Sequence, residues 1–169
     1  ENMAYSLIKL TPTIVAAELA LNDVLFDSTE VVLPAHTCKL VSATIVDYQN
    51  KLTAEDVALI FHHDNAGGSF GTSADAESLS SANAVLNQPI AAVRCNHETE
   101  GTGTNFNILT SYSITGSAAP VSSPVILSKD KSDDKLFVMG KIVVLSTAGT
   151  LDDTNADGGD LAVYLGFEY

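Results

Sequence analysis

The chain has 169 residues, of which 46% are hydrophobic, and its 21 acidic and 8 basic residues give a formal net charge of −13. A chain of this length and apolar content can bury a core of its own, which excludes disorder as its general state. So acidic a surface repels phosphate backbones and anionic lipid headgroups, so we expect neither nucleic acid nor a membrane as a partner.

The beginning of the chain shows no basic region followed by an apolar run, so no signal peptide is visible, and earlier removal of one stays open. No apolar run reaches the roughly 20 residues of a membrane helix. Whether Met3 is the natural start, with Glu1 and Asn2 left by processing, stays open.

Nine segments have the composition of β-strands and are separated by turn residues. In chain order they are residues 5–10, 23–33, 38–48, 57–62, 91–95, 108–114, 125–127, 135–145 and 161–169. Their regular spacing predicts an all-β sandwich or barrel in which residues 1–169 form a single domain. Residues 64–87 and 96–107 read as long loops, and one short helix is expected near 74–84.

The last two strands differ in pattern. In 161–169, alternation predicts that Leu161, Val163, Leu165, Phe167 and Tyr169 face the core. The segment 135–145 is apolar at consecutive positions, which predicts burial on both faces. A central strand and a strand covered by a neighbouring subunit both remain open for it.

An acidic turn precedes the final strand. Asp153, Asn155 and Asp157, followed by Gly158, match the first half of a calcium loop. The twelfth position, where a bidentate Glu belongs, is Tyr164 inside the predicted strand. We therefore favour a simple acidic turn and keep calcium as the alternative.

The two cysteines each stand two residues from a histidine, in His36-Thr-Cys38 and Cys95-Asn-His97. Residues two apart in a strand point the same way, so each pair presents two potential zinc ligands. Two cysteines are too few for a disulfide scaffold, and a reducing cytoplasm is the simplest site of synthesis. Independent buried thiols are favoured, while a zinc site and a Cys38–Cys95 disulfide remain alternatives.

The histidines, the glycine-rich run and the aromatic residues do not form a recognisable catalytic site. His62 and His63 are expected as a solvent-facing pair at a strand end, and no Gly-x-Ser-x-Gly elbow accompanies them. The run 67–71 lacks the Lys-Ser/Thr of a phosphate loop. The aromatics Tyr48, Phe106, Tyr112 and Tyr164 suit packing better than sugar stacking. We expect no enzyme activity, no catalytic or metal residues and no cofactor.

Several short motifs follow one another in a distinctive order. They are Thr-Pro-Thr at 11–13, Asn22-Asp23-Val24, Val46-Asp47, Asp56 to Phe61 followed by Asp64-Asn65, an Ala-Ala-Val strand at Ala91, Leu136-Phe137-Val138, and Asp160 to Leu165. This order resembles that of small tailed-phage virion proteins. The resemblance is to capsid decoration or cement proteins, and it covers most of the chain.

This resemblance implies an antiparallel jelly-roll β-sandwich of about eight strands, with residues 1–13 as an N-terminal arm. It also implies a non-enzymatic protein of the virion, made in the host cytoplasm, that binds the major capsid protein as a homo-oligomer, most simply a trimer. Residues 4–13 and the exposed positions of the last two strands are the expected contacts. A carbohydrate-binding or lectin-like module, or a fibre or tail component, remains the alternative.

Overall fold

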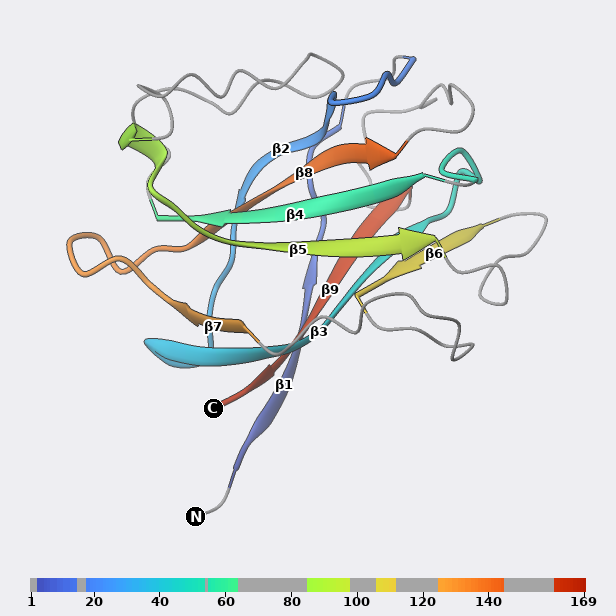
Figure 1. Cartoon of the computed structure of the whole chain (residues 1–169). Coiled ribbons are helices and arrows are strands. Elements are labelled where there is room, and N and C mark those ends of the chain that lie inside the picture. Colours follow the sequence, from blue (N-terminus) through green and yellow to red (C-terminus); the bar gives the residue numbers. More distant parts are fainter. Residues whose placement is uncertain are drawn as a thin grey trace.

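The computed structural model of the chain describes residues 3–14, 18–53, 55–63, 85–97, 106–111, 125–144 and 160–169. Nine strands occupy most of these residues: β1 (Tyr5–Leu10), β2 (Val24–Glu30), β3 (Thr37–Asp47), β4 (Asp56–His62), β5 (Pro89–His97), β6 (Asn107–Thr110), β7 (Val125–Ser128), β8 (Phe137–Val144) and β9 (Leu161–Glu168). Each overlaps one of the nine predicted segments (Figure 1). The described helical structure is a single turn at residues 85–87.

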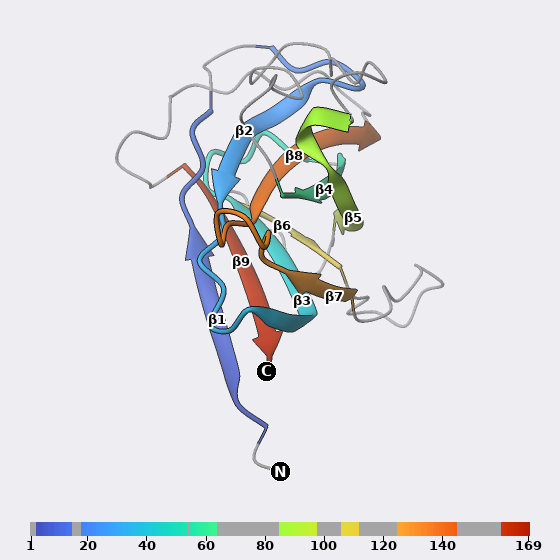
Figure 2. The same ribbon diagram turned by 90° about the vertical axis from the view of Figure 1, so that its left-hand side faces the viewer.

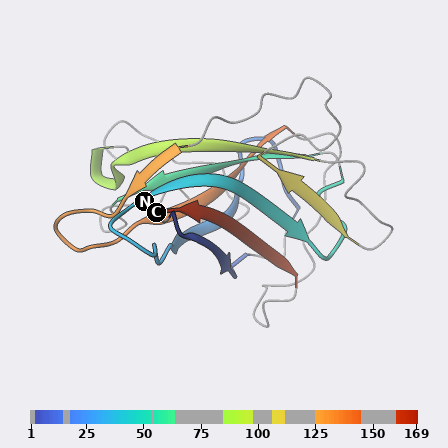
Figure 3. The same ribbon diagram turned by 90° about the horizontal axis from the view of Figure 1, so that it is seen from below.

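The strands form two layers of a sandwich. The first layer has the order β1-β9-β3, and both β6 and β7 pair with the far edge of β3. The second layer has the order β2-β8-β4-β5. Figure 3 shows the two layers from below. All pairings are antiparallel, and this is the order of a jelly roll in which β6 and β7 share one strand position. The predicted fold class is confirmed.

One edge of the sandwich is closed and the other is open. β5 and β6 join the layers through the pairs Asn96↔Thr110 and His97↔Leu109. At the opposite side, β1 and β2 are the outermost strands of their layers. Figure 2 shows β1 at that open edge, with its N-terminal end reaching past the rest of the sandwich.

The core lies between the layers and follows the predicted alternation. Val57, Leu59 and Phe61 of β4 are fully buried, as are Val163 and Leu165 of β9, all in one continuous cluster. Burying such side chains contributes about 1.5–3 kcal/mol each. Tyr169 departs from the pattern: it is 46% exposed, because it follows the end of β9.

The middle of strand β8 is buried on both faces, as predicted, while Lys141 and Val143 are half-buried and Val144 is exposed. Val138 and Ile142 belong to the main core, while Met139 forms a second buried cluster with Val24 on the other face. β8 lies between β2 and β4, so it is a central strand. Its apolar surface is buried within one chain, and a neighbouring subunit is not needed to account for it.

A close approach between β2 and β8 requires a glycine. Phe26 and Gly140 are paired in register, and Phe26 is fully buried. A Cβ on Gly140 would overlap the Phe26 ring, so any larger residue would displace that ring or the strand.

The predicted loops are partly corrected. β5 runs to His97, so Asn96 and His97 belong to a strand and not to the expected 96–107 loop. Pairing with β6 extends β5 through residues whose polar character suggested a loop. The helix expected near 74–84 lies outside the described residues. No helix in the described part of the chain is long and apolar enough to cross a membrane.

Candidate interaction surface

The two cysteines lie in the core as free thiols. The Cys38 thiol contacts the carbonyl oxygen of Ala35 at 3.5 Å, and the Cys95 thiol contacts that of Ala43 at 3.9 Å. Burial, and to a lesser degree the negative charge of Asp56, raise the pKa of the Cys95 thiol to about 12. Such a thiol is a small core side chain without nucleophilic reactivity at neutral pH. The disulfide alternative is not formed.

The zinc site kept as an alternative does not assemble from the two His/Cys pairs. His36 precedes β3 and is exposed, with its Nδ1 3.5 Å from Asp134 Oδ1, whereas Cys38 is buried. The Nε2 of His97 lies 3.4 Å from Asn107 Oδ1. Within the described residues, no three His, Cys, Asp or Glu side chains are arranged to hold a metal ion.

His62 and His63 were expected to face solvent, and this was wrong for His62. His62 is fully buried, its Nε2 lies 2.9 Å from Ser28 Oγ, and its ring stacks on Phe137 at 5.6 Å between centroids. His63 is half-buried, with its Nε2 2.8 Å from the carbonyl oxygen of Ser128. Both histidines therefore connect strands that are distant in sequence.

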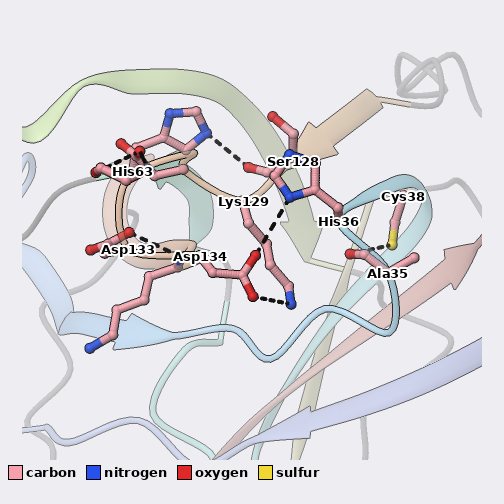
Figure 4. A network of polar contacts seen from close by, with 11 residues as sticks. Ala35, His36, Cys38, His63, Ser128, Lys129, Asp133 and Asp134 are labelled. Carbon is pink, nitrogen blue, oxygen red and sulfur yellow. Dashed lines mark hydrogen bonds and ion pairs between the residues drawn. The ribbon is translucent and has the colours of Figure 1, made fainter.

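A polar network holds the turn between β7 and β8 (Figure 4). Asp134 accepts a hydrogen bond from Lys129 Nζ at 3.2 Å and also faces His36. The backbone N–H of Lys129 donates to the carbonyl of His36 at 2.9 Å, which joins this turn to the β2–β3 connection. Within the turn, the Asp130 carboxylate accepts bonds from the N–H and hydroxyl of Ser132.

This network also sets the local charge state. The Lys129 hydrogen bond, with a smaller contribution from His36, lowers the pKa of Asp134. The bonds from Ser132 lower the pKa of Asp130. Each acidic group thus has a local partner, and the arrangement is that of a self-capped turn.

Aromatic side chains gather at the other end of β3. Tyr48 and Phe106 flank the terminal pair Asp47↔Asn107 and are 44% and 39% exposed. The pKa of Tyr48 is raised mainly by its hydrogen bond with Tyr164 and to a smaller degree by burial. Tyr112 lies outside the described residues, as do Asp153, Asn155 and Asp157, so the calcium alternative stays a prediction.

The outer face of the first layer carries the main exposed apolar surface of the described strands. Tyr5 and Leu7 on β1 are 66% and 68% exposed, and Ile126 on β7 is 64% exposed. Val41, at the bulge in β3, lies between them and is 41% exposed. We call these four side chains the apolar face.

The strand register brings them onto one surface. Tyr5 pairs with Glu168, Glu168 with Lys39, and Lys39 with Ile126. Tyr5 and Ile126 therefore lie at the two ends of one row across the layer, with the Glu168 and Lys39 side chains between them. Leu7 pairs with Gly166, where the absence of a side chain leaves room for Val41 and Ser42.

This surface is also poor in charge. The five strands of the layer contain only Lys9, Lys39, Asp47 and Glu168 as charged residues. Asp47 is buried, and Lys39 Nζ lies 3.0 Å from Glu168 Oε2. On a molecule of net charge −13, an apolar surface with one unpaired lysine favours contact with another macromolecule.

The sequence reading anticipated only part of this surface. Residues 4–13 were named as contacts, and they contain Tyr5 and Leu7. Val41 and Ile126 were missed, because 38–48 and 125–127 were predicted as strands without an assignment of their exposed faces. The predicted contacts on the last two strands are few, since β8 exposes little beyond Val144 and β9 little beyond the following Tyr169.

Comparison with known proteins identified no relative. A scan against protein-family models gave no match, and a search of curated proteins gave none either.

Proposed function

We propose that this protein is a non-enzymatic structural protein of a tailed-phage virion. It binds the outer capsid surface as an oligomer, contacts the major capsid protein and stabilises the shell. The observation that carries this is the apolar face, which is exposed on a rigid β-layer and has little charge.

The jelly-roll topology agrees with the fold that the sequence resemblance implies. The residues most suggestive of chemistry have structural partners: Cys95 is a core thiol, His62 stacks on Phe137, and Asp134 holds a turn. Function is therefore sought at the surface and not in a reaction centre.

The mechanism is burial of apolar surface at many equivalent positions of a lattice. A single patch containing Val41 and Ile126 gives modest affinity, but repeated contacts raise the total occupancy. A protein that binds assembled shells better than free capsid subunits stabilises the assembled state by mass action.

The test uses particles of the encoding phage. We expect mass spectrometry to find the protein in purified virions, and particles lacking it to release DNA at a lower temperature. Adding back purified protein should restore the release temperature. Ile126→Lys should fail to restore it, because a charge would be desolvated within the contact.

Val85→Lys provides the matched control, since Val85 is 75% exposed and lies outside the apolar face. It should restore the release temperature as wild type does. Absence of the protein from intact virions would refute the proposed function, and equal restoration by both variants would refute the proposed surface.

A carbohydrate-binding module is the second candidate, favoured by Tyr48 and Phe106 at one end of the first layer. Exposed aromatic rings stack on sugar faces. In this case glycan-array binding should be detectable and should be lost in Tyr48→Ala. Binding lost with a chelator would add a calcium site, whereas no binding to any glycan would eliminate this candidate.

A further inference from the structure

The outer edge of β1 offers backbone groups for pairing. Ala4 and Tyr169 exchange two backbone hydrogen bonds, at 3.1 and 3.0 Å. Antiparallel pairs alternate between hydrogen-bonded and non-hydrogen-bonded, so the N–H and C=O of Tyr5, Leu7 and Lys9 point away from β9. In the described part of the chain, no strand pairs with that edge.

This edge has few of the features that normally prevent strand pairing. β1 keeps a regular register with β9 over six residues, without a bulge, and its only charged residue is Lys9. Its side chains at Tyr5 and Leu7 are exposed and apolar. Natural edge strands are usually shortened, bulged, charged or covered.

The other outermost strand shows the contrast. The pairing of β2 with β8 contains two register shifts, and β2 carries Asp27 and Glu30. Its outer edge is partly occupied, because the Asp27 N–H donates to the Thr13 carbonyl at 3.4 Å. Protection is therefore stronger at β2, whereas β1 has Lys9 alone.

We propose that β1 pairs antiparallel with β1 of a second copy of this chain, in a two-fold dimer centred on Leu7. Tyr5 then lies opposite Lys9 of the second copy, and Leu7 lies opposite its own counterpart. All three residues present outward backbone groups, so the Leu7–Leu7 pair and the two Tyr5–Lys9 pairs are hydrogen-bonded ones, and the Ser6–Ile8 pairs between them are not. The two first layers join into one continuous sheet.

Side-chain chemistry selects this register and this partner. It places two leucines together and a tyrosine ring beside a lysine, both favourable cross-strand pairs. A register centred on Lys9 would instead oppose two like charges. Among the described strands of the layer, the acid on the outer surface is Glu168, which is paired with Lys39, so these strands of two copies approach without opposing unpaired carboxylates.

The dimer goes beyond the proposed function, since it concerns free protein and needs no capsid. Two-fold pairing uses the same patch on both copies and closes as a dimer. It therefore differs from the trimer that the sequence resemblance implies, and mass measurement separates the two. If the protein forms a trimer whose mass is unchanged by substitutions at Leu7, the dimer proposal is wrong, but the virion proposal is unaffected.

The first experiment is site-specific cross-linking under a mild oxidant. In a hydrogen-bonded pair the two Leu7 Cα atoms would lie about 5.5 Å apart, within the range for a disulfide. Leu7→Cys should form a covalent dimer. Tyr5→Cys should not, because the two engineered thiols would be about four residues, or about 13 Å, apart along the strands.

The native thiols do not interfere, since Cys38 and Cys95 are buried. No cross-link in Leu7→Cys would overturn the pairing. Equal cross-linking of Leu7→Cys and Tyr5→Cys would overturn this register.

The second experiment is sedimentation over a concentration series. Wild type should approach twice the monomer mass, and Leu7→Lys should weaken association at least about tenfold by opposing two charges. Val85→Lys is the matched control, because Val85 is 75% exposed and precedes β5, away from the open edge formed by β1 and β2. It should associate as wild type does.

Mixing provides a test of the symmetry itself. Leu7→Lys and Leu7→Glu should each be monomeric alone, and an equimolar mixture should dimerise because the opposite charges face each other. A wild-type monomer at all concentrations, or a mixture that stays monomeric, would refute the proposal.

Discussion

Asp47 organises the turn that follows β3, and its removal gives a sharp test of the fold. Its Oδ1 accepts the Gln49 N–H at 2.9 Å, and its Oδ2 accepts the N–H groups of Lys51 and Leu52 at 2.6 and 2.7 Å. Oδ2 also accepts Asn107 Nδ2 at 3.2 Å. One buried carboxylate thus satisfies three backbone donors and one side chain from β6.

The expected cost of Asp47→Ala follows from these bonds. A hydrogen bond to a charged acceptor contributes about 1.5–3 kcal/mol, and an unsatisfied buried donor costs about 1–3 kcal/mol. Leu52 is fully buried, so its N–H has little access to water. The exposed part of the turn can relax, so we expect a loss of about 3–4 kcal/mol in the free energy of unfolding. This is a large part of the about 5–15 kcal/mol typical of a domain.

Urea unfolding followed by circular dichroism measures this loss. Asn107→Ala removes only one of the four bonds and should cost about 1–2 kcal/mol. Asp47→Asn keeps the shape but places an NH₂ group among converging donors, so it should cost nearly as much as Asp47→Ala. A loss below about 1 kcal/mol in Asp47→Ala would refute this account of the turn.

Two further predictions concern the core. Gly140→Ala should lower the free energy of unfolding by about 1–3 kcal/mol, because its Cβ overlaps the Phe26 ring. In urea unfolding, adding Phe26→Leu to Gly140→Ala should recover part of that loss. Strictly additive costs of the two changes would contradict the contact. The pKa of Cys95 is raised from 9.0 to about 12, so above about pH 9 only the unfolded thiol ionises. The free energy of unfolding should then fall by about 1.4 kcal/mol per pH unit up to about pH 12. In Cys95→Val this contribution to the dependence of the free energy of unfolding on pH should be absent. Identical slopes for the two proteins would contradict the burial of the thiol.

The strands were predictable because local patterns and the final environment agree. Val57, Leu59 and Phe61 alternate in sequence and are all fully buried. In 135–145, consecutive apolar residues predicted a strand buried on both faces, and Val138 and Met139 lie in different clusters. Sequence left open whether a second subunit was required, since periodicity cannot identify what covers a face.

Other features depend on contacts between distant segments. His62 looked like a solvent-facing residue, but Ser28 and Phe137 on neighbouring elements enclose it. Asn96 looked like loop and is a strand residue because it pairs with Thr110. Such pairings override local propensity and cannot be read from composition.

Two residues of the apolar face, Val41 and Ile126, were not predicted for a similar reason. Val41 is exposed because a bulge in β3 shifts the alternation there. Ile126 is exposed because it pairs in register with Lys39 on the outer side of the layer, while the neighbouring pair Cys38 and Leu127 faces the core. Only the register shows that they share a surface with Leu7.

The charge of the chain gives the β1 dimer a distinctive dependence on salt. Two molecules of net charge −13 repel each other, while the proposed contact contains no intermolecular ion pair. The Debye length falls from about 30 Å at 0.01 M to about 10 Å at 0.1 M ionic strength, so added salt weakens the general repulsion. It leaves the backbone hydrogen bonds and the Leu7 contact almost unchanged. Sedimentation should therefore show more dimer at higher ionic strength, in Val85→Lys as in wild type. Dissociation by salt would mean that ion pairs hold the copies together, and a contact centred on Leu7 would then be wrong.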